Sequence, residues 1–484
     1  MNADTPTGPA GHVVVIGGGI SGLAAAHRLL TAGRRVTLLE ATGRLGGKLH
    51  AGEIAGAPVD LGAESMLARR PEAVDLARAV GLGDRLTPPA TTTASVWTRD
   101  ALRPMPKGHV MGVPGDARVL GGLLSDEGLR RVGQDRELPP ADLGDDIAIG
   151  AYVAARMGRE VVDRLVEPLL GGVYAGDAYR ISMRAAVPKL FDEARAHGTL
   201  SEAVRAVQEA AGAQTGPAFM GIEGGVGRLP QAVADAIAAL GGEILLDTRV
   251  HALTRRPGRG GGRAGGWDVR TADRLIHADG VILATPAWSS SALLAAESPA
   301  AAAELTEVEY ASMALVTLAF RRADAEAALP AGSGFLVPPV DGRTIKASTF
   351  SSQKWRWVTD GAPDLFVLRT SVGRYGEEEH LQREDDDLVS VSLTDLATAT
   401  GLTARPVATE VTRWIGGLPQ YPVGHLARVA RIRDAVAKLP ALRVCGAVYD
   451  GVGIPACVAS GRRAADEILT TPTLAQGTLS DERE

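Results

Sequence analysis

The sequence predicts an α/β fold in which the first domain is interrupted by two large inserts. A strand, a glycine-rich turn, a helix and a second strand follow one another within the first 40 residues. Short apolar segments at 278–285 and 442–447 predict returns of the chain to the same sheet. With 484 residues, the chain has room for about three domains.

The N-terminal unit begins with HVVVI at 12–16, a β-branched run typical of a parallel strand buried on both faces. Residues 21–32 are rich in Ala and Leu and end at Gly33, as a helix with a glycine C-cap does. The run RVTLLE at 35–40 is the second strand. Together these segments form one βαβ unit.

Later segments are also predicted to join this sheet. Residues 249–253 and 267–270 have the pattern of a hairpin. The glycine-rich, charged stretch 257–266 between them is expected to be a solvent loop. The strands at 278–285 and 442–447 are short and apolar, as buried parallel strands are.

Two inserts separate these segments. The first is predicted to be largely helical, because apolar residues have helical spacing at 148–157, 160–170 and 200–211. The second contains strand-like runs at 314–320, 334–338 and 364–371.

The turn after the first strand has the spacing GxGxxG. Gly17 allows the tight turn, Gly19 allows the backbone to approach a pyrophosphate, and Gly22 allows the helix to pack on the strand. The helix N-terminus offers free N–H groups to a diphosphate. Glu40 ends the next strand, where its carboxylate can accept from both ribose hydroxyls and repel the 2′-phosphate of NADP. The pattern predicts a dinucleotide site; the alternative is a glycine turn beside a surface glutamate.

A second glycine loop, GRLGGK at 43–48, follows at once. A nicotinamide dehydrogenase has no need of such a loop. Its glycines let it run beneath an extended cofactor, and Arg44 and Lys48 offer charge to phosphates. We therefore expect FAD rather than NAD; the alternative is a basic turn without a ligand.

Composition excludes several classes of protein. The net charge of −6 argues against a general nucleic-acid binder, and 45% hydrophobic with 22% charged residues argues against wholesale disorder. Two cysteines cannot build a disulfide framework, and no metal site is expected. No signal peptide and no run of 18 apolar residues is visible. We expect a cytoplasmic protein with at most a peripheral contact to the inner face of the cell membrane.

Both ends of the chain resemble one superfamily of flavoproteins. GGGISGL at 17–23 with LLEATGRLGGK at 38–48 resembles the N-terminal signature of flavoprotein amine oxidases, phytoene-desaturase-like enzymes and porphyrinogen oxidases. GAVYDGVGIPACVASGR at 446–462 is similar to the segment that lays backbone N–H groups against the isoalloxazine in these enzymes.

Other segments resemble the bacterial FAD-dependent protoporphyrinogen and coproporphyrinogen III oxidases more than the amine oxidases. They include DLGAESMLARRP at 60–71, EPLLGGVYAGD at 167–177 and TRWIGGLPQYPVGH at 412–425. The resemblance implies a discontinuous Rossmann-like FAD-binding domain, a mainly helical, membrane-associated insert and a mixed α+β substrate domain. The implied boundaries are 12–90, 216–289 and 413–472 for the FAD-binding domain, 91–215 for the helical insert, 290–412 for the substrate domain, and flexible tails at 1–11 and 473–484.

The glycine motifs and the resemblance together imply a set of cofactor contacts. They are Gly17, Gly18, Gly19, Ile20, Ser21, Gly22, Glu40, Arg44, Gly47, Lys48, Gly62, Ala63, Glu64, Ser65, Val250, Trp414, Gly446, Gly453, Ile454 and Pro455.

The implied reaction is the oxygen-dependent oxidation of coproporphyrinogen III to coproporphyrin III in haem biosynthesis. Six hydrogens leave in three hydride transfers to non-covalent FAD, and molecular oxygen reoxidises the flavin to give hydrogen peroxide. No catalytic side chain is expected, because the flavin carries the hydride step. A composition rich in Ala, Gly and Arg is typical of high-GC bacteria, which favours coproporphyrinogen III as substrate. A ferrochelatase is the expected recipient of the product.

The substrate carries propionates, which need basic partners. Arg69 and Arg70 follow the turn GAES at 62–65 and are expected to bind the propionates. The alternative is that they are two exposed surface charges. Further candidates are Lys346 and, more weakly, Lys354, Arg369 and Arg374.

Three alternatives remain open at this point. Protoporphyrinogen IX, with two propionates and two vinyls, is the other candidate substrate. A flavin amine oxidase would need an aromatic cage, which is hard to build with 4% aromatic residues, and often a flavin-linked cysteine. Cys445 and Cys457 are better interpreted as buried core residues. A non-enzymatic dinucleotide-binding scaffold would leave the two inserts unexplained.

Overall fold

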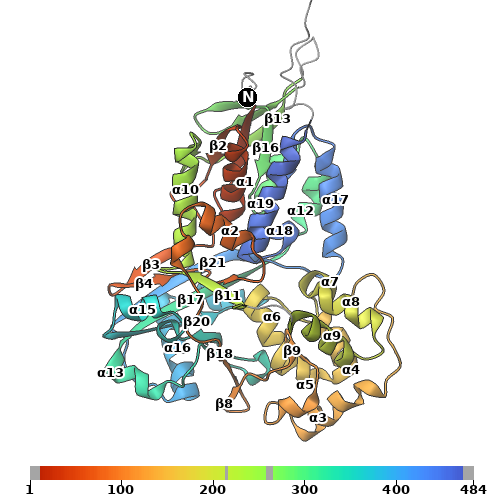
Figure 1. Ribbon diagram of the computed structural model, residues 1–484, viewed down its shortest axis with the longest axis vertical. Coiled ribbons are helices and arrows are strands. Elements are labelled where there is room, and N and C mark those ends of the chain that lie inside the picture. The colour runs from red at the N-terminus through yellow and green to blue at the C-terminus, as the bar shows by residue number, and fades with distance from the viewer. Residues whose placement is uncertain (1–10, 213–215, 258–264, 472–484) are drawn as a thin grey trace, which may run out of the picture.

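The structure is a computed structural model, and it has three main parts (Figure 1). It describes residues 11–212, 216–257 and 265–471. Most of the predicted solvent loop and almost all of both predicted tails lie outside the described residues.

A five-stranded parallel sheet forms the part at the top of Figure 1. The predicted strands at 12–16 and 35–40 and the helix between them are confirmed. Every residue of the first strand is buried, as expected for the centre of a covered sheet. In spatial order the strands are β12 (Glu243–Leu245), β2 (Arg35–Leu39), β1 (His12–Ile16), β16 (Gly280–Leu283) and β22 (Leu442–Val444).

Layers of different kinds cover the two faces of this sheet. On one face the apolar side chains of three helices form a core with the sheet; these are α1 (Ile20–Thr31), α10 (Leu229–Ala239) and α19 (Ile454–Leu469). On the other face lie a small antiparallel sheet and three helices, α11 (Ala287–Leu294), α12 (Pro299–Thr306) and α17 (His425–Ala437).

The predicted hairpin forms, but the prediction that it joins the parallel sheet is wrong. β13 (Ala252–Arg255), β14 (Trp267–Arg270) and β15 (Leu275–Ala278) make a separate antiparallel sheet. Leu253, Trp267 and Val269 pack against the parallel sheet. Because these strands pair with one another, they stack on the face of the parallel sheet rather than extend its edge.

A seven-stranded sheet forms the second part, at the lower left of Figure 1. Helix α16 (Asp385–Thr400) packs its apolar side chains against one face. The predicted strand runs in 290–412 all belong to this sheet. Its strands are β21 (Ala408–Pro419), β17 (Tyr310–Arg321), β20 (Leu365–Val372), β19 (Ile345–Thr349), β18 (Gly334–Leu336), β7 (Ser95–Thr98) and β8 (Ala101–Pro104).

Two of the predicted boundaries cut across this sheet and need correction. β7 and β8 come from the segment 91–215, yet β7 pairs in parallel with β18, with Ser95 opposite Phe335. β21 crosses the predicted boundary between 412 and 413 without interruption. Pairing between strands more than 200 residues apart leaves no local pattern in the sequence.

The third part, at the lower right of Figure 1, is helical as predicted. The three predicted helical segments are confirmed, with a π-helical turn at Val162–Val166 inside the second. No helix in the described ranges is long and apolar enough to cross a membrane. The main helices are α3 (Asp126–Gly133), α4 (Ile149–Met157), α5 (Arg159–Val161), α6 (Glu167–Tyr174) and α9 (Leu200–Gly212).

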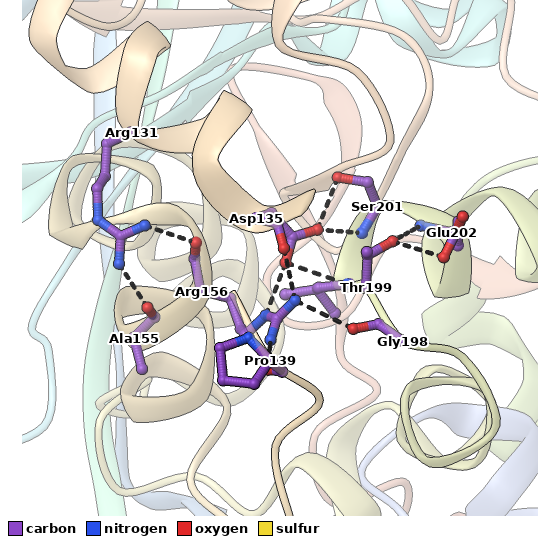
Figure 2. Close-up of polar contacts among 10 residues, drawn as sticks. Arg131, Asp135, Pro139, Ala155, Arg156, Gly198, Thr199, Ser201 and Glu202 are labelled. Atoms are coloured by element: carbon purple, nitrogen blue, oxygen red, sulfur yellow. Dashed lines mark hydrogen bonds and ion pairs between the residues drawn. The ribbon is translucent and has the colours of Figure 1, made fainter. Parts of the chain in front are cut away.

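A buried ion pair joins these helices (Figure 2). Arg156, which is 3% exposed, donates to the carboxylate of the fully buried Asp135 at 2.7 Å. The same carboxylate accepts the backbone N–H and hydroxyl of Ser201 at 2.8 and 2.9 Å, at the start of α9. Arg156 also donates to the backbone carbonyl of Pro139 at 2.6 Å. Because each charge is hydrogen-bonded, the pair fixes how α4 meets α9.

Candidate functional site

Three glycines shape the turn between β1 and α1, and they do so for different reasons. Gly17 has a φ of +110°, and a Cβ there would lie 2.7 Å from the carbonyl oxygen of Ala284. A Cβ on Gly22 would lie 1.9 Å from the carbonyl oxygen of Gly17. Gly19 is extended (φ −68°, ψ 170°), and a Cβ there would meet no described atom within 4 Å. Neither strain nor protein contact explains glycine at 19, and open space lies before the N-terminus of α1.

The carboxylate of Glu40 is turned toward this loop from the end of β2. Its Oε2 accepts the backbone N–H of Gly18 at 2.8 Å, and its Oε1 accepts the N–H and hydroxyl of Thr42 at 2.9 and 2.8 Å. The N–H of Thr248 donates to the Glu40 carbonyl at 2.8 Å. This hydrogen bond holds the segment that continues to Val250 next to Glu40. The structure thus brings the first glycine turn, Glu40 and the Val250 segment together.

The second glycine loop lies against the first. The N–H of Gly46 donates to the carbonyl of Gly18 at 2.8 Å. The Arg44 guanidinium donates to the carbonyl of Gly47 at 2.6 Å and lies 5.6 Å over the ring of Trp414. The arginine therefore shapes the loop as well as offering charge beside it.

Three segments distant in sequence converge next to this loop. A Cβ on Gly62 would lie 2.1 Å from the carbonyl oxygen of Lys48 and 3.1 Å from the Trp414 ring. Ala63 N–H donates to the Lys48 carbonyl at 3.1 Å, and the indole N–H of Trp414 donates to the Leu61 carbonyl at 3.1 Å. Lys48 remains in contact with solvent, but many protein atoms surround its ammonium group. They remove part of its hydration, and this desolvation lowers the pKa of the ammonium.

The C-terminal segment completes the region. Helix α19 packs along α1 so closely that a Cβ on Gly461 would lie 2.0 Å from the carbonyl of Ser21. Further along, Arg28 pairs with Asp466, so the two helices run in the same direction. Because Ser21 meets the middle of α19, that helix begins about two turns, or roughly 10 Å, before α1 does. The N-terminus of α19, with Gly453, Ile454 and Pro455, is therefore displaced from the N-terminus of α1 along the direction that the two helices share.

Glu64 is buried in an ion-pair cluster with two cations. Lys354 is one partner, and Arg369 is the other, with Nη2 3.1 Å from Oε2. Burial acts to raise the pKa of Glu64, but Arg369 and Lys354 outweigh it and hold that pKa below its ordinary value. Arg369 also donates to the Gly62 carbonyl at 2.8 Å. The cluster ties the segment 60–65 to the seven-stranded sheet, and it engages two of the weaker propionate candidates.

Asp60 is an anchoring residue that the sequence analysis missed. Its buried carboxylate accepts the N–H groups of Val226 and Gly227 at 3.0 and 2.9 Å. Burial raises the pKa of Asp60 to about 7. Its place two residues before Gly62, the first residue of the GAES turn, was the one signal in the sequence.

The structure separates the stronger propionate candidates. Arg69 and Arg70 are exposed, and Arg70 pairs with Glu72 at 2.8 Å. Lys346 is buried on β19, and its Nζ lies 3.9 Å from the Sδ of Met313. The two arginines therefore face solvent, whereas the lysine lies inside the protein.

The remaining predicted residues have plain locations. Ile20 opens α1, and Ser65 follows the Glu64 cluster. Arg374 donates to backbone carbonyls on the seven-stranded sheet, at 3.2 and 3.3 Å. Cys445 and Cys457 are buried free thiols, as predicted. Gly446 has a φ of +128°, and its N–H donates to the Ser460 hydroxyl at 2.9 Å.

Comparison with known proteins assigns the family. The profile of the flavin-containing amine oxidoreductases matches residues 20–469. This chain belongs to that family. Membership implies a flavin cofactor, for which the loops above form one continuous region.

Three relatives narrow the resemblance. Coproporphyrinogen III oxidase of Mycobacterium tuberculosis is 37% identical over 94% of this chain and 96% of the relative. Coproporphyrinogen III oxidase of Bacillus subtilis is 32% identical over 95% of this chain and 98% of the relative. The crystal structure of an Exiguobacterium protein named as a protoporphyrinogen oxidase matches with a TM-score of 0.83 and 33% identity, over 96% of this chain and 99% of that one. The predicted resemblance to the porphyrinogen-oxidising branch is confirmed.

Proposed function

We propose that this protein oxidises coproporphyrinogen III to coproporphyrin III, with dioxygen as the terminal acceptor and hydrogen peroxide as the second product. The observation that carries the proposal is the likeness to two coproporphyrinogen III oxidases over almost the full length of both chains. Protoporphyrinogen IX is the alternative substrate, because the Exiguobacterium neighbour bears that name.

Non-covalently bound FAD is the flavin that we propose, held in a Rossmann-like domain. The order of the parallel strands reverses at β1: β2 and β12 lie on one side of it, and β16 and β22 lie on the other. Ligands of parallel sheets bind at the carboxyl ends of the strands at such a point. The space before Gly19 lies there, and the N–H groups of α1 would bind a diphosphate in it. Glu40 would hold the ribose through the free lone pair of Oε2.

The other end of the region suits the isoalloxazine ring. Gly62, Trp414 and the first turn of α19 would surround it, and the positive end of the α19 dipole favours negative charge there. A flavin bound there supplies the acceptor for hydride. The chain's own residues orient the ring, keep out water and hold the substrate against it.

The substrate would enter between the flavin-binding domain and the seven-stranded sheet. Arg69 and Arg70 are exposed and follow the Gly62 segment in the sequence, and their guanidinium groups can form charge-assisted hydrogen bonds with propionates. A substrate with four propionates would gain more binding energy from this positive charge than a substrate with two. The arginines therefore favour the tetracarboxylate.

The test is a direct comparison of substrates. Purified protein should be yellow and should release free FAD when it is denatured. Incubation with each porphyrinogen in air should produce red porphyrin fluorescence, faster with coproporphyrinogen III. A higher kcat/KM for protoporphyrinogen IX would identify that molecule as the substrate in place of coproporphyrinogen III. Oxidation of primary amines, without oxidation of either porphyrinogen, would overturn the proposal.

A further inference from the structure

Lys346 is a buried amine that forms no ion pair with any described residue. The residue is 7% exposed, and among the described residues its amine has one hydrogen-bond contact, the thioether of Met313, with Nζ 3.9 Å from Sδ. An ammonium buried without a paired charge is costly, so such a group tends to lose its proton. Burial, together with the nearby Arg374, lowers the pKa of Lys346 to about 7, although Glu377 opposes this shift.

Charged side chains surround β19 on the elements packed against it, and each has partners of its own. Arg374 donates to three backbone carbonyls and pairs with Glu377 at 3.4 Å. Arg369 on β20 is held by the Glu64 carboxylate. Asp395 on α16 accepts two backbone N–H groups at 3.0 Å, and Glu167 on α6 accepts one at 2.7 Å. Within this described group, only Lys346 has nothing stronger than a thioether to bind.

The Lys346 amine lies on the face of the sheet that is turned toward the proposed flavin site. Met313 on β17 is paired directly with Trp414 on β21, so the two side chains share a face. Trp414 stands against Gly62. Strand β20 lies between β17 and β19, so the Lys346 side chain reaches Met313 across β20, and Trp414 lies on the next strand beyond Met313.

A local irregularity of β19 adds a second observation. The register of β19 with β20 shifts between Ile345 and Ala347, which places Lys346 in a bulge. Bulges re-aim side chains and are frequent beside functional sites. A buried amine at this depth would face the macrocycle, whereas the exposed Arg69 and Arg70 would meet the propionates at its rim.

We propose that the Lys346 amine accepts the proton that a pyrrole N–H group of the porphyrinogen releases in each two-electron step. This inference rests on the function proposed above. It adds a proton acceptor to a reaction for which the sequence analysis expected no catalytic side chain.

Each two-electron step balances in atoms and electrons, and over the three steps one meso hydrogen moves to a pyrrole nitrogen by tautomerisation, because forming the porphyrin removes four meso hydrogens and two N–H hydrogens. A meso C–H bond breaks, and its electron pair leaves with the hydrogen as hydride. The pyrrole nitrogen shares its lone pair with the electron-poor carbon framework, and its N–H bond then breaks with the pair left on nitrogen. The proton bonds to the neutral Nζ, and the resulting ammonium returns it to solvent. Hydride and proton together are the two hydrogens that dioxygen takes up as hydrogen peroxide.

Two substitutions distinguish proton transfer from binding of a propionate. Lys346→Arg keeps the positive charge that an ion pair needs but cannot act as a base near neutral pH. Lys346→Met removes both properties. We expect both variants to lose about 10²–10³-fold in kcat on coproporphyrinogen III, a typical effect of losing an acid–base group. KM and the affinity for the product coproporphyrin III, measured by fluorescence titration, should change less than about threefold. Lys189→Met, at an exposed lysine of the helical part, is the control and should behave as wild type.

Rescue and labelling give independent readouts. Methylamine should restore part of the kcat of Lys346→Ala in proportion to its free-base concentration. Competitive acetylation of the wild-type holoenzyme, read by mass spectrometry, should show that Lys346 reacts as a neutral amine at pH 8, far ahead of Lys189. Wild-type kcat in Lys346→Arg, a raised KM alone in Lys346→Met, or ordinary lysine reactivity would overturn the inference while leaving the proposed function intact. A wild type inactive on both porphyrinogens would overturn both.

Discussion

Gly19→Val and Gly22→Ala test whether the first glycine turn is built for a ligand. Gly19 has an extended backbone and no described atom within 4 Å of a Cβ, so valine fits the protein itself. A Cβ on Gly22 would lie 1.9 Å from the carbonyl oxygen of Gly17, so alanine collides with backbone. The two glycines lie three residues apart, yet we expect their replacement to fail for different reasons.

The structure sets the size of each effect. To reach ordinary contact at 3.4 Å from 1.9 Å, Gly22→Ala must separate α1 from the turn by about 1.5 Å. Overpacking of this kind costs about 1–3 kcal/mol in the free energy of unfolding. Gly19→Val changes an N-cap residue and costs the flavin-free protein about 1 kcal/mol. Its branched side chain occupies the proposed diphosphate site, and loss of a ligand present at 100 times its Kd removes about 2.7 kcal/mol of stabilisation.

Thermal unfolding of flavin-free protein, with and without added FAD, separates the two effects. We expect flavin-free Gly19→Val to melt within about 4 °C of the flavin-free wild type and to gain nothing from FAD. Gly22→Ala should melt at a lower temperature even without FAD. Far-UV circular dichroism provides the control for helix content. A Gly19→Val protein that purifies with one FAD per chain would refute the assignment of this space to the diphosphate.

Three further predictions test other parts of the molecule. Glu40→Ala should lose FAD on gel filtration, because a charge-assisted hydrogen bond worth about 1.5–3 kcal/mol is removed; full occupancy would contradict the ribose assignment. Replacing both Arg69 and Arg70 with Ala should raise KM for coproporphyrinogen III more than for protoporphyrinogen IX, and should change kcat less than KM. Added salt should diminish the increase in KM. Unchanged KM values for both substrates would show that these arginines do not bind propionates. Arg156→Met leaves the Asp135 carboxylate buried without its counter-charge and should lower the free energy of unfolding by about 3–5 kcal/mol in urea titrations, whereas a loss below 1 kcal/mol would show that the pair is not structural.

Features carried by short stretches of sequence could be predicted. The β-branched run at 12–16, the helix that follows it and the strand ending at Glu40 form as predicted, because burial on both faces and helix propensity act within a few residues. The GxGxxG spacing likewise predicted where the backbone must turn and pack, as Gly17 and Gly22 show. The family resemblance followed because these motifs keep their order along the chain.

Contacts between distant segments were decided only by the tertiary structure. The sequence placed Glu64 among the flavin contacts and Arg369 among the propionate candidates, and the fold buries them as an ion pair. It assigned β7 to the helical insert, although its hydrogen bonds are made with β18.

Lys346 shows the physical reason most clearly. A lysine in a strand gives no sign of whether it faces solvent, a carboxylate or a thioether, because that depends on which strands pair and in what register. The register that sets Met313 opposite Trp414 and the bulge at Lys346 leave this amine buried, with no counter-charge paired to it in the part of the chain that the structure describes. The sequence alone determined which chemical groups are available, and strand pairing over hundreds of residues decided which of them are desolvated together.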